Sequence, residues 1–197
     1  MRERNSLSRS NAAVVVILFT AATLVATAVT ASAAASNCAV LLVPGSVDSS
    51  GELLATEVDL GCYPTYAEAL SVGSSGAIDV PAFTTPASLT DAVLAADTIA
   101  TATADVLIGT EFTGVSYGGT SKSYFASATC STGVVWGVAD VGASWDNEFS
   151  SGKGFGGCDT NKKFENTNFG GSVLTCTPNC TNYGTLSNQV SSLRWKP

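Results

Sequence analysis

The sequence predicts a mostly β protein, in which a β-sandwich follows a small acidic α+β region and an N-terminal export signal. Three observations lead to this prediction. From Val106 onward Gly, Ser, Thr and aromatic residues dominate and no long helical period occurs, which is typical of short strands joined by frequent turns. Before that residue the charge balance is strongly acidic. The first 35 residues are basic and then apolar, which is typical of a targeting segment.

Residues 1–35 have the features of a signal peptide. Three arginines in the first nine residues precede an apolar stretch over 12–30, and Ala31-Ser32-Ala33 fits a cleavage site. The stretch approaches the length that spans a bilayer, so a membrane anchor is the alternative. No basic stop-transfer cluster follows it. We therefore expect cleavage, a secreted extracellular protein and no membrane association afterwards.

Residues 36–197 carry six basic and 15 acidic side chains, a net charge of −9, and the whole chain has no His. Binding to a nucleic-acid backbone needs clustered Lys and Arg, so we expect no nucleic-acid partner. The absence of His excludes Ser-His-Asp triads, Cys-His dyads and His-ligated zinc. No pair of carboxylates stands in a setting that the sequence identifies as a cleft. The sequence therefore predicts that the protein is not an enzyme.

The charges divide this part of the chain in two. Residues 36–105 contain nine acidic side chains and no Lys or Arg, whereas residues 106–197 contain six of each sign. The shift falls near the small residues 101–104, which are typical of a linker. We expect an acidic α+β region over 36–105, either packed as a subdomain or removed as a pro-segment, and the β-sandwich over 106–197.

The acidic region is predicted to contain a hairpin and two short helices. An apolar run over 38–43 and alternating apolar and polar residues over 54–60 predict two strands, with a turn at 49–51. The segment 65–68 matches a capping box and predicts the start of a short helix. Pro86 suits the first position of a second helix.

All six Cys follow the expected cleavage site, which in a secreted chain predicts three disulfides. Cys38 and Cys62 are equidistant from Ser50, so a hairpin that turns there sets the two sulfurs opposite each other. Cys176 and Cys180 can close a local loop around a Pro-Asn turn. The expected pairs are Cys38–Cys62, Cys176–Cys180 and, from the two cysteines that remain, Cys130–Cys158.

The second half contains two copies of one unit. The segments 107–114 and 164–171 each place an apolar residue five before a Phe and a Gly two after it. Each segment is followed by a polar one, at 146–151 and at 187–192. The polar segments align as polar, Asn, any residue, apolar, Ser, Ser.

This pairing of aromatic-x4-aromatic-x-Gly with a later (Asn/Asp)-(Asn/Asp)-x-x-(Ser/Thr)-Ser resembles the βγ-crystallin family. The resemblance covers 106–197 and implies two Greek keys packed as a β-sandwich. In microbial members the polar segments bind Ca²⁺ at two sites between the paired loops, and each site draws ligands from both copies. Two departures are expected to weaken one hairpin and one site: Leu107 replaces the first aromatic residue of copy one, and Ser187 replaces an Asn or Asp of copy two.

The resemblance implies a set of oxygen ligands that suits Ca²⁺, which takes about six to eight oxygens. Side chains and backbone carbonyls of the two polar segments would supply most of them, and the hairpins would each add a carbonyl. The implied ligand residues are Glu111, Asp146, Asn147, Glu148, Ser150, Glu165, Asn188, Gln189 and Ser191. The alternative is that both motifs are turns in which Ser hydroxyls bond to local backbone.

These observations predict a secreted, monomeric Ca²⁺-binding protein in which the metal stabilises the sandwich. Analogy of fold suggests alternatives: an inhibitor of a secreted protease, because bacterial metalloproteinase inhibitors resemble the same sandwich, or a killer-toxin-like protein. Stabilisation by Ca²⁺ without inhibition favours the first function. Inhibition of a metalloprotease without added Ca²⁺ favours the second.

Overall fold

The computed structural model describes residues 36–49, 51–97 and 104–197. All described residues belong to one compact unit. The expected signal peptide and residues 101–103 of the expected linker lie outside the described residues. None of the helices in the described ranges is long and apolar enough to cross a membrane.

The two copies of the repeat form two interlocked sets of strands. Copy one forms β3 (Val106–Phe112), β4 (Ser121–Ala126), β5 (Trp136–Val138) and β6 (Ser151–Gly154), and copy two forms β7 (Thr160–Phe164), β8 (Val173–Cys176) and β9 (Ser192–Lys196). β5 leaves its own copy and pairs with β9, and Gly152 of β6 forms a bridge with Cys180 of copy two. The third strand of copy one, β5, therefore joins the strands of copy two, and the segment around Cys180 of copy two joins β6 of copy one. This exchange gives two Greek keys in a mostly β fold, as expected.

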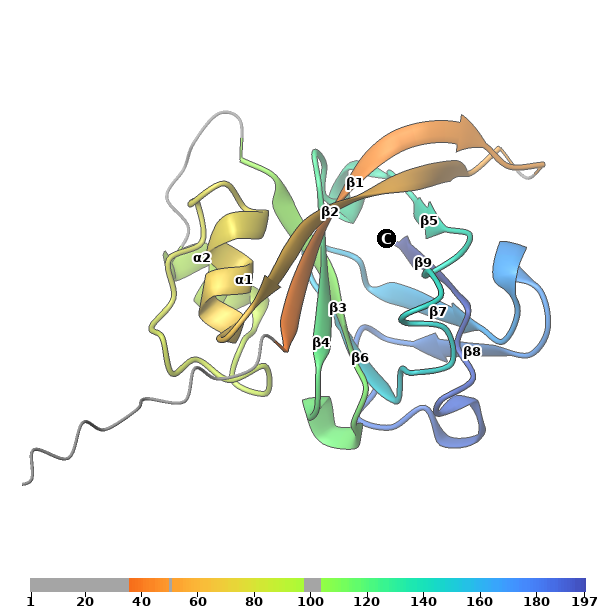
Figure 1. The fold of residues 1–197 in the computed structure, drawn as a ribbon. Coiled ribbons are helices and arrows are strands. Elements are labelled where there is room, and N and C mark those ends of the chain that lie inside the picture. Colours follow the sequence, from red (N-terminus) through yellow and green to blue (C-terminus); the bar gives the residue numbers. More distant parts are fainter. Residues whose placement is uncertain (1–35, 50, 98–103) are drawn as a thin grey trace, which may run out of the picture. The chain divides into compact units, whose positions relative to one another are not determined.

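An N-terminal hairpin joins the two halves into one curled sheet. β1 (Asn37–Val47) and β2 (Leu53–Tyr63) pair with each other, β1 runs parallel to β4, and β2 runs parallel to β5. The resulting order is β6-β3-β4-β1-β2-β5-β9-β7-β8 (Figure 1). The hairpin thus covers two strand edges that would otherwise offer unpaired backbone groups to other chains.

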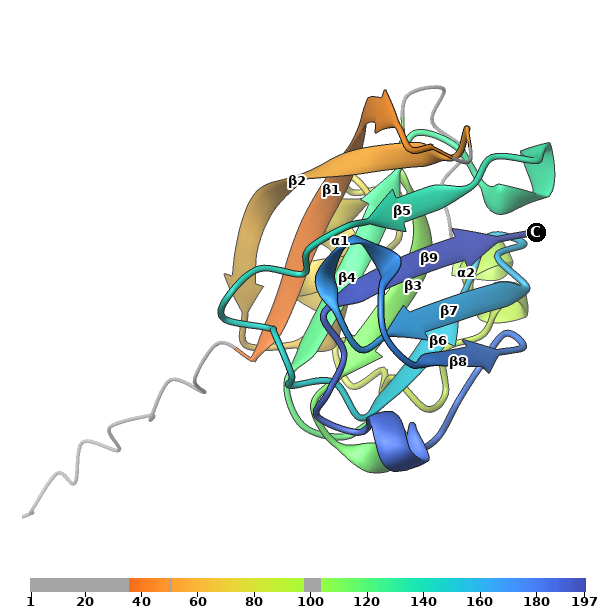
Figure 2. The ribbon, with the colours of Figure 1, turned by 90° about the vertical axis from the view of Figure 1, so that its right-hand side faces the viewer.

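The main core lies between the two halves of the sheet. Figure 2 shows β5, β9, β7 and β8 in front, with β4, β3 and β6 behind them. Trp136 and Trp195, opposite each other on β5 and β9, are fully buried in this core together with Tyr124 and Phe149. Burial of such large apolar side chains is the main stabilising contribution in a small sandwich.

The helix α1 (Tyr66–Gly73) packs on the outer face of the sheet, against β1, β2 and β4. Its cap is the predicted capping box, since the Thr65 hydroxyl accepts from the Glu68 amide and the Glu68 carboxylate accepts from the Thr65 amide. Leu70 and Phe125 are both fully buried in a second apolar cluster there. Gly73 is required at this contact, because a Cβ would lie 2.0 Å from the Phe125 ring.

The second helix begins later than Pro86 predicts. α2 (Asp91–Asp97) starts after Thr90, whose hydroxyl accepts from the Val93 amide at 3.3 Å. The carbonyls that precede it point elsewhere: Lys153 Nζ donates to the oxygens of Pro86, Ala87 and Leu89 at 2.8, 3.2 and 2.7 Å. Because these carbonyls hold a buried ammonium group, the segment stays a loop.

The acidic part of the chain, 36–105, and the part that carries the basic side chains, 106–197, form ion pairs with each other within one sheet. Basic side chains of 106–197 reach acidic or carbonyl oxygens of 36–105. The ion pairs are Lys122–Glu57, Arg194–Asp48, Arg194–Glu52 and Lys196–Glu52. The acidic excess of the first part is therefore partly neutralised by the second.

All three expected disulfides are present in the structure. Cys38 and Cys62 face each other across β1 and β2 and close the open end of the hairpin. Cys130–Cys158 ties copy one across its long connection, and Cys176–Cys180 closes a short loop. None of the cysteines is free.

Candidate functional site

The two polar segments, here polar loop 1 (146–151) and polar loop 2 (187–192), bind each other reciprocally. The amide of Asn147 donates to the carbonyl of Val190 at 3.1 Å, and the amide of Asn188 donates to the carbonyl of Phe149 at 2.8 Å. Asn147 and Asn188 also share a left-handed backbone, with φ of 61° and 57°, which Asn tolerates better than most residues. The loops are therefore related by an approximate two-fold axis.

The side chains of the loops also meet across this axis. Ser191 Oγ donates to Asp146 Oδ1 at 2.5 Å, and Ser150 Oγ donates to Asn188 Oδ1 at 2.8 Å. In each pair the fifth residue of one loop contacts an acidic or amide side chain of the other. The structure thus brings together expected site residues from both copies, at two places.

The first place, here the Asp146 site, is a pocket of about 520 Å³. Its lining residues come from both polar loops and from the hairpin of copy two: Asp146, Asn147, Glu165, Asn166, Thr167, Gln189 and Ser191. Asn147 Nδ2 donates to Asp146 Oδ2 at 3.0 Å, so both oxygens of that carboxylate have partners. The Ser172 amide donates to the Glu165 carboxylate at 3.0 Å, which lowers the pKa of Glu165.

The second place, here the Asn188 site, differs in charge. The side chains that meet there, Ser150 and Asn188, are both neutral. Ser187 stands where polar loop 1 has Asp146, and its hydroxyl donates to Asn182 Oδ1 at 3.1 Å. The departure noted in the sequence therefore leaves the Asn188 site without the carboxylate that the Asp146 site has.

The hairpin of copy one has both aromatic residues of its motif, although the sequence alignment left the first of them missing. Phe112 and Tyr117 form an edge-to-face pair with ring centroids 5.7 Å apart, and Phe164 and Phe169 form the same pair at 5.4 Å. Both hairpins also contain a short 3₁₀ turn, Val115–Tyr117 in copy one and Thr167–Phe169 in copy two. Phe112 therefore corresponds to Phe164, and Leu107 replaces no aromatic residue.

The structure also changes one expected ligand position in this hairpin. The residue that corresponds to Glu165 is Thr113, because each directly follows the first aromatic residue of its hairpin. Glu111 lies instead in the core, is fully buried, and pairs with Lys163 and Tyr183. The Glu111 carboxylate is therefore occupied within the core, and Thr113 is the residue of copy one that stands at the position of Glu165. The motif Phe112-x4-Tyr117-x-Gly119 was present in the sequence and becomes visible once Tyr is counted among the aromatic residues.

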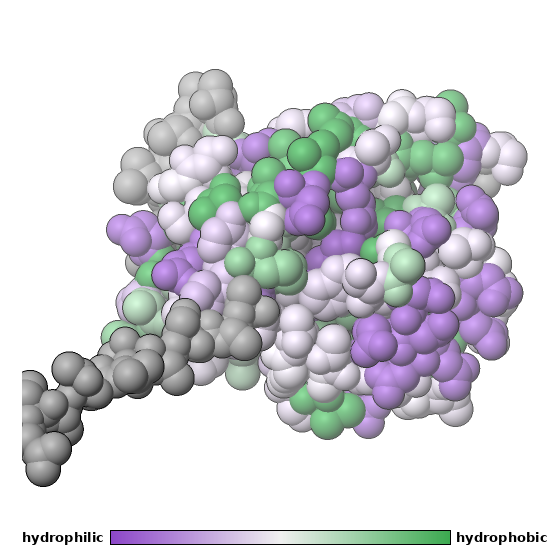
Figure 3. Space-filling model, viewed as in Figure 1, coloured by the Kyte–Doolittle hydropathy of each residue, from purple (hydrophilic) through white to green (hydrophobic). Residues whose placement is uncertain are grey.

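The surface on the side of copy two is hydrophilic. Figure 3 shows a largely hydrophilic surface on the lower right face, on the side of copy two. The parts of the chain that the structure describes contain no cluster of three His, Cys, Asp or Glu residues that could hold a metal. The residues that line the Asp146 site carry carboxylate, amide and hydroxyl oxygens, which are ligand types that Ca²⁺ prefers.

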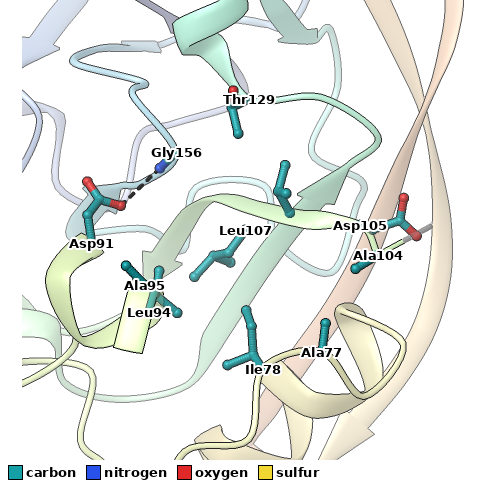
Figure 4. Close-up of a pocket in the computed structure, with 11 residues that line it drawn as sticks. Ala77, Ile78, Asp91, Leu94, Ala95, Ala104, Asp105, Leu107, Thr129 and Gly156 are labelled. Atoms are coloured by element: carbon teal, nitrogen blue, oxygen red, sulfur yellow. Dashed lines mark hydrogen bonds between the residues drawn. The ribbon is translucent and has the colours of Figure 1, made fainter. Parts of the chain in front are cut away.

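A second pocket, of about 240 Å³, lies between α2 and β3 (Figure 4). Its walls are mostly apolar and include Ile78, Leu94 and Leu107. The Asp91 carboxylate at its edge accepts a hydrogen bond from the Gly156 amide at 3.0 Å. That carboxylate therefore ties the start of α2 to copy one and serves a structural role.

No family model matches the chain, and no curated protein matches it either. Among solved structures it is similar to a βγ-crystallin from an Archaea, with 20% identity over 46% of this chain and 98% of the other and a TM-score of 0.34. A βγ-crystallin domain from Clostridium beijerinckii has 18% identity over 45% and 97%, with a TM-score of 0.36. A βγ-crystallin from Ciona intestinalis has 21% identity over 43% and 94%, with a TM-score of 0.34.

Proposed function

We propose that the protein is secreted and binds Ca²⁺ at the Asp146 site, where the ion links the two Greek keys. The observation that carries the proposal is the contact between Asp146 of copy one and Ser191 of copy two, 2.5 Å apart at a pocket of about 520 Å³. A cation bound there would be held by oxygens of both copies. It would stabilise the folded state because the unfolded chain does not bring those oxygens together.

The residues of the Asp146 site have separate roles in this proposal. Asp146 supplies the carboxylate, Ser191 the hydroxyl, and Gln189 and Glu165 supply backbone carbonyls. The Glu165 carboxylate adds negative charge to the same pocket, and the amide of Ser172 favours its ionised form. Bound Ca²⁺ would join the two copies through its coordination bonds and its charge, and it would take part in no chemical reaction.

The two sites should bind unequally. Calcium affinity rises with the number of charged ligands, and extracellular modules bind with dissociation constants on the order of 10⁻⁴ to 10⁻³ M. The Asn188 site has the neutral pair Ser150–Asn188 where the Asp146 site has an ionised carboxylate. We therefore assign the stronger binding to the Asp146 site.

Secretion is supported by the signal-like segment and by the disulfides. Three disulfides in one small chain persist in oxidising compartments and are rare in the reducing cytosol. We assign no catalysis to the protein. The one dense cluster of reactive groups that we identify in the described chain, Glu111, Lys163 and Tyr183, is buried to 2% exposure or less and offers a substrate no access.

Isothermal titration of the secreted protein with CaCl₂ tests the proposal. Wild type should bind one Ca²⁺ more tightly than any second, and Asp146→Asn should remove the tighter event. Glu148→Gln is the matched control, because it neutralises a carboxylate of the same loop that does not line the pocket. Equal binding by wild type and Asp146→Asn, or no binding by wild type, would overturn the proposal and make a protease-inhibition screen the next step.

A further inference from the structure

A buried lysine outside the Asp146 site holds the chain segment that leads into it. Lys122 on β4 is 3% exposed, and its ammonium group donates to the Val141 carbonyl at 2.9 Å and to the Glu57 carboxylate at 2.5 Å. Glu57 lies on β2 of the N-terminal hairpin, and Val141 lies five residues before Asp146. The Lys122 side chain thus links the hairpin to the segment that runs from β5 to polar loop 1.

Short contacts continue from Val141 to the Asp146 carboxylate. The Val141 amide donates to the Ser191 carbonyl at 3.1 Å, so Val141 is held on the same residue whose hydroxyl contacts Asp146. The next residue, Gly142, accepts at its carbonyl from the amides of Trp145 and Asp146, at 2.9 and 3.0 Å. The position of Val141 therefore sets the turn from which the Asp146 side chain projects.

Lys122 is needed to hold this turn in place, because an open pocket lies beside the turn. A pocket of about 260 Å³ lies between the hairpin and the turn, lined by Glu57, Lys122 and residues 141–145. The Lys122 ammonium also lies 5.8 Å from the ring centroid of Trp145, the residue directly before Asp146. Without the ammonium group the turn would lose the hydrogen bond at the Val141 carbonyl and could relax into the pocket.

The repeat shows that this contact belongs to one site only. Lys122 pairs with Glu111 in the register of β3 and β4, and the corresponding residue of copy two, opposite Lys163, is Leu174. Leu174 has no group that could hold a carbonyl. The tether is therefore specific to the Asp146 site, and it depends on a hairpin that precedes the repeat.

We propose that Lys122 is a positioning residue for the Asp146 site and that the N-terminal hairpin, through Glu57, thereby sets the affinity of that site for Ca²⁺. This inference rests on the proposed function. Groups that orient a metal ligand without touching the metal commonly change affinity as strongly as weak ligands do. Burial lowers the pKa of Lys122, and the Glu57 carboxylate opposes that effect.

The test compares two double variants of the full, secreted chain. Glu57→Leu/Lys122→Met removes the tether and leaves no unpaired buried charge, so the protein should still fold. Glu52→Gln/Lys196→Met is the control, because it breaks the ion pairs of Glu52 with Lys196 and Arg194, which involve the same hairpin and do not contact the turn. The readouts are Ca²⁺ affinity by titration with CaCl₂ and hydrogen exchange of the Trp145 and Asp146 amides without metal.

We expect the first double variant to bind Ca²⁺ about tenfold more weakly than wild type, and the control to bind as wild type does. The two amides should exchange faster in the first variant only. Unchanged affinity and unchanged exchange in the first variant would overturn the inference. If wild type binds no Ca²⁺, the proposed function fails, and the exchange measurement still decides whether Lys122 holds the turn.

Discussion

The hydroxyl of Ser191 contacts the carboxylate of Asp146 at 2.5 Å, although 45 positions of the chain separate the two residues. Asp146 belongs to the first copy of the repeat and Ser191 to the second. The contact therefore exists only when both Greek keys are folded and interlocked. A ligand that binds these two groups together would stabilise the whole sandwich and not one half of it.

Ser191→Ala should lower the affinity for Ca²⁺ and also the metal-free stability. The loss of one hydrogen bond to a charged group is expected to lower the free energy of unfolding by about 1.5 to 3 kcal/mol. Urea unfolding in chelator measures the change. Ser150→Ala is the matched control, because it removes the same hydroxyl at the neutral site and should cost less. A larger loss for Ser150→Ala would contradict the assignment of charge to the Asp146 site.

Glu111→Ala should be among the most destabilising substitutions in the chain. Glu111 and Lys163 are 0% and 1% exposed at their side chains, so removal of the carboxylate leaves a buried unpaired ammonium. Such a loss costs about 3 to 5 kcal/mol. The double variant Glu111→Leu/Lys163→Met should recover much of it, since neither charge then remains. Guanidinium unfolding of the three proteins checks this, and an additive effect of the two changes would rule the explanation out.

Removal of Cys130–Cys158 should cost more stability than removal of Cys176–Cys180. The sequence separations are 28 and 4 residues, so the first disulfide excludes far more conformations of the unfolded chain. The chain-entropy estimate gives about 3 to 4 kcal/mol for the first and about 2 kcal/mol for the second. Thermal unfolding of the two Cys→Ser double variants measures both. The opposite order would show that local native contacts, and not chain entropy, dominate.

The pH dependence of stability should carry a contribution from Glu57. Burial raises the pKa of Glu57 above its ordinary value of 4.5, an effect that Lys122 opposes and that the nearby Asp140 and Asp59 reinforce. The folded state therefore holds this proton more tightly than the unfolded state does. The contribution is fully present below pH 4.5 and is lost as the pH rises through the raised pKa. Urea unfolding from pH 4 upward should show this decline in wild type, whereas Glu57→Gln should lack it.

Several parts of the fold could be predicted because they depend on local patterns. The hairpin, the capping box at Thr65 and the three disulfides follow from spacing along the chain, and the structure contains each of them. The two Greek keys followed from a repeated motif. The start of α2 could not be predicted from Pro86, because a lysine 67 positions away takes the preceding carbonyls.

The two polar segments could be recognised for the same reason, since they repeat a local pattern. The resemblance implied that each site draws residues from both polar segments, and the structure pairs Asp146 with Ser191 and Ser150 with Asn188. The hairpin of copy one was misplaced because an apolar Leu and a Phe fit its pattern five positions too early. The role of Lys122 has no local signal, since it depends on a hairpin that packs between β4 and β5 only in the folded protein.

The most direct test of the account is thermal unfolding of the secreted protein in chelator and then in millimolar Ca²⁺, beside the double variant Asp146→Ala/Asn188→Ala. The account predicts that Ca²⁺ raises the Tm of wild type and leaves the Tm of the variant unchanged. A Tm of wild type that does not respond to Ca²⁺, or an equal rise in both proteins, would contradict it.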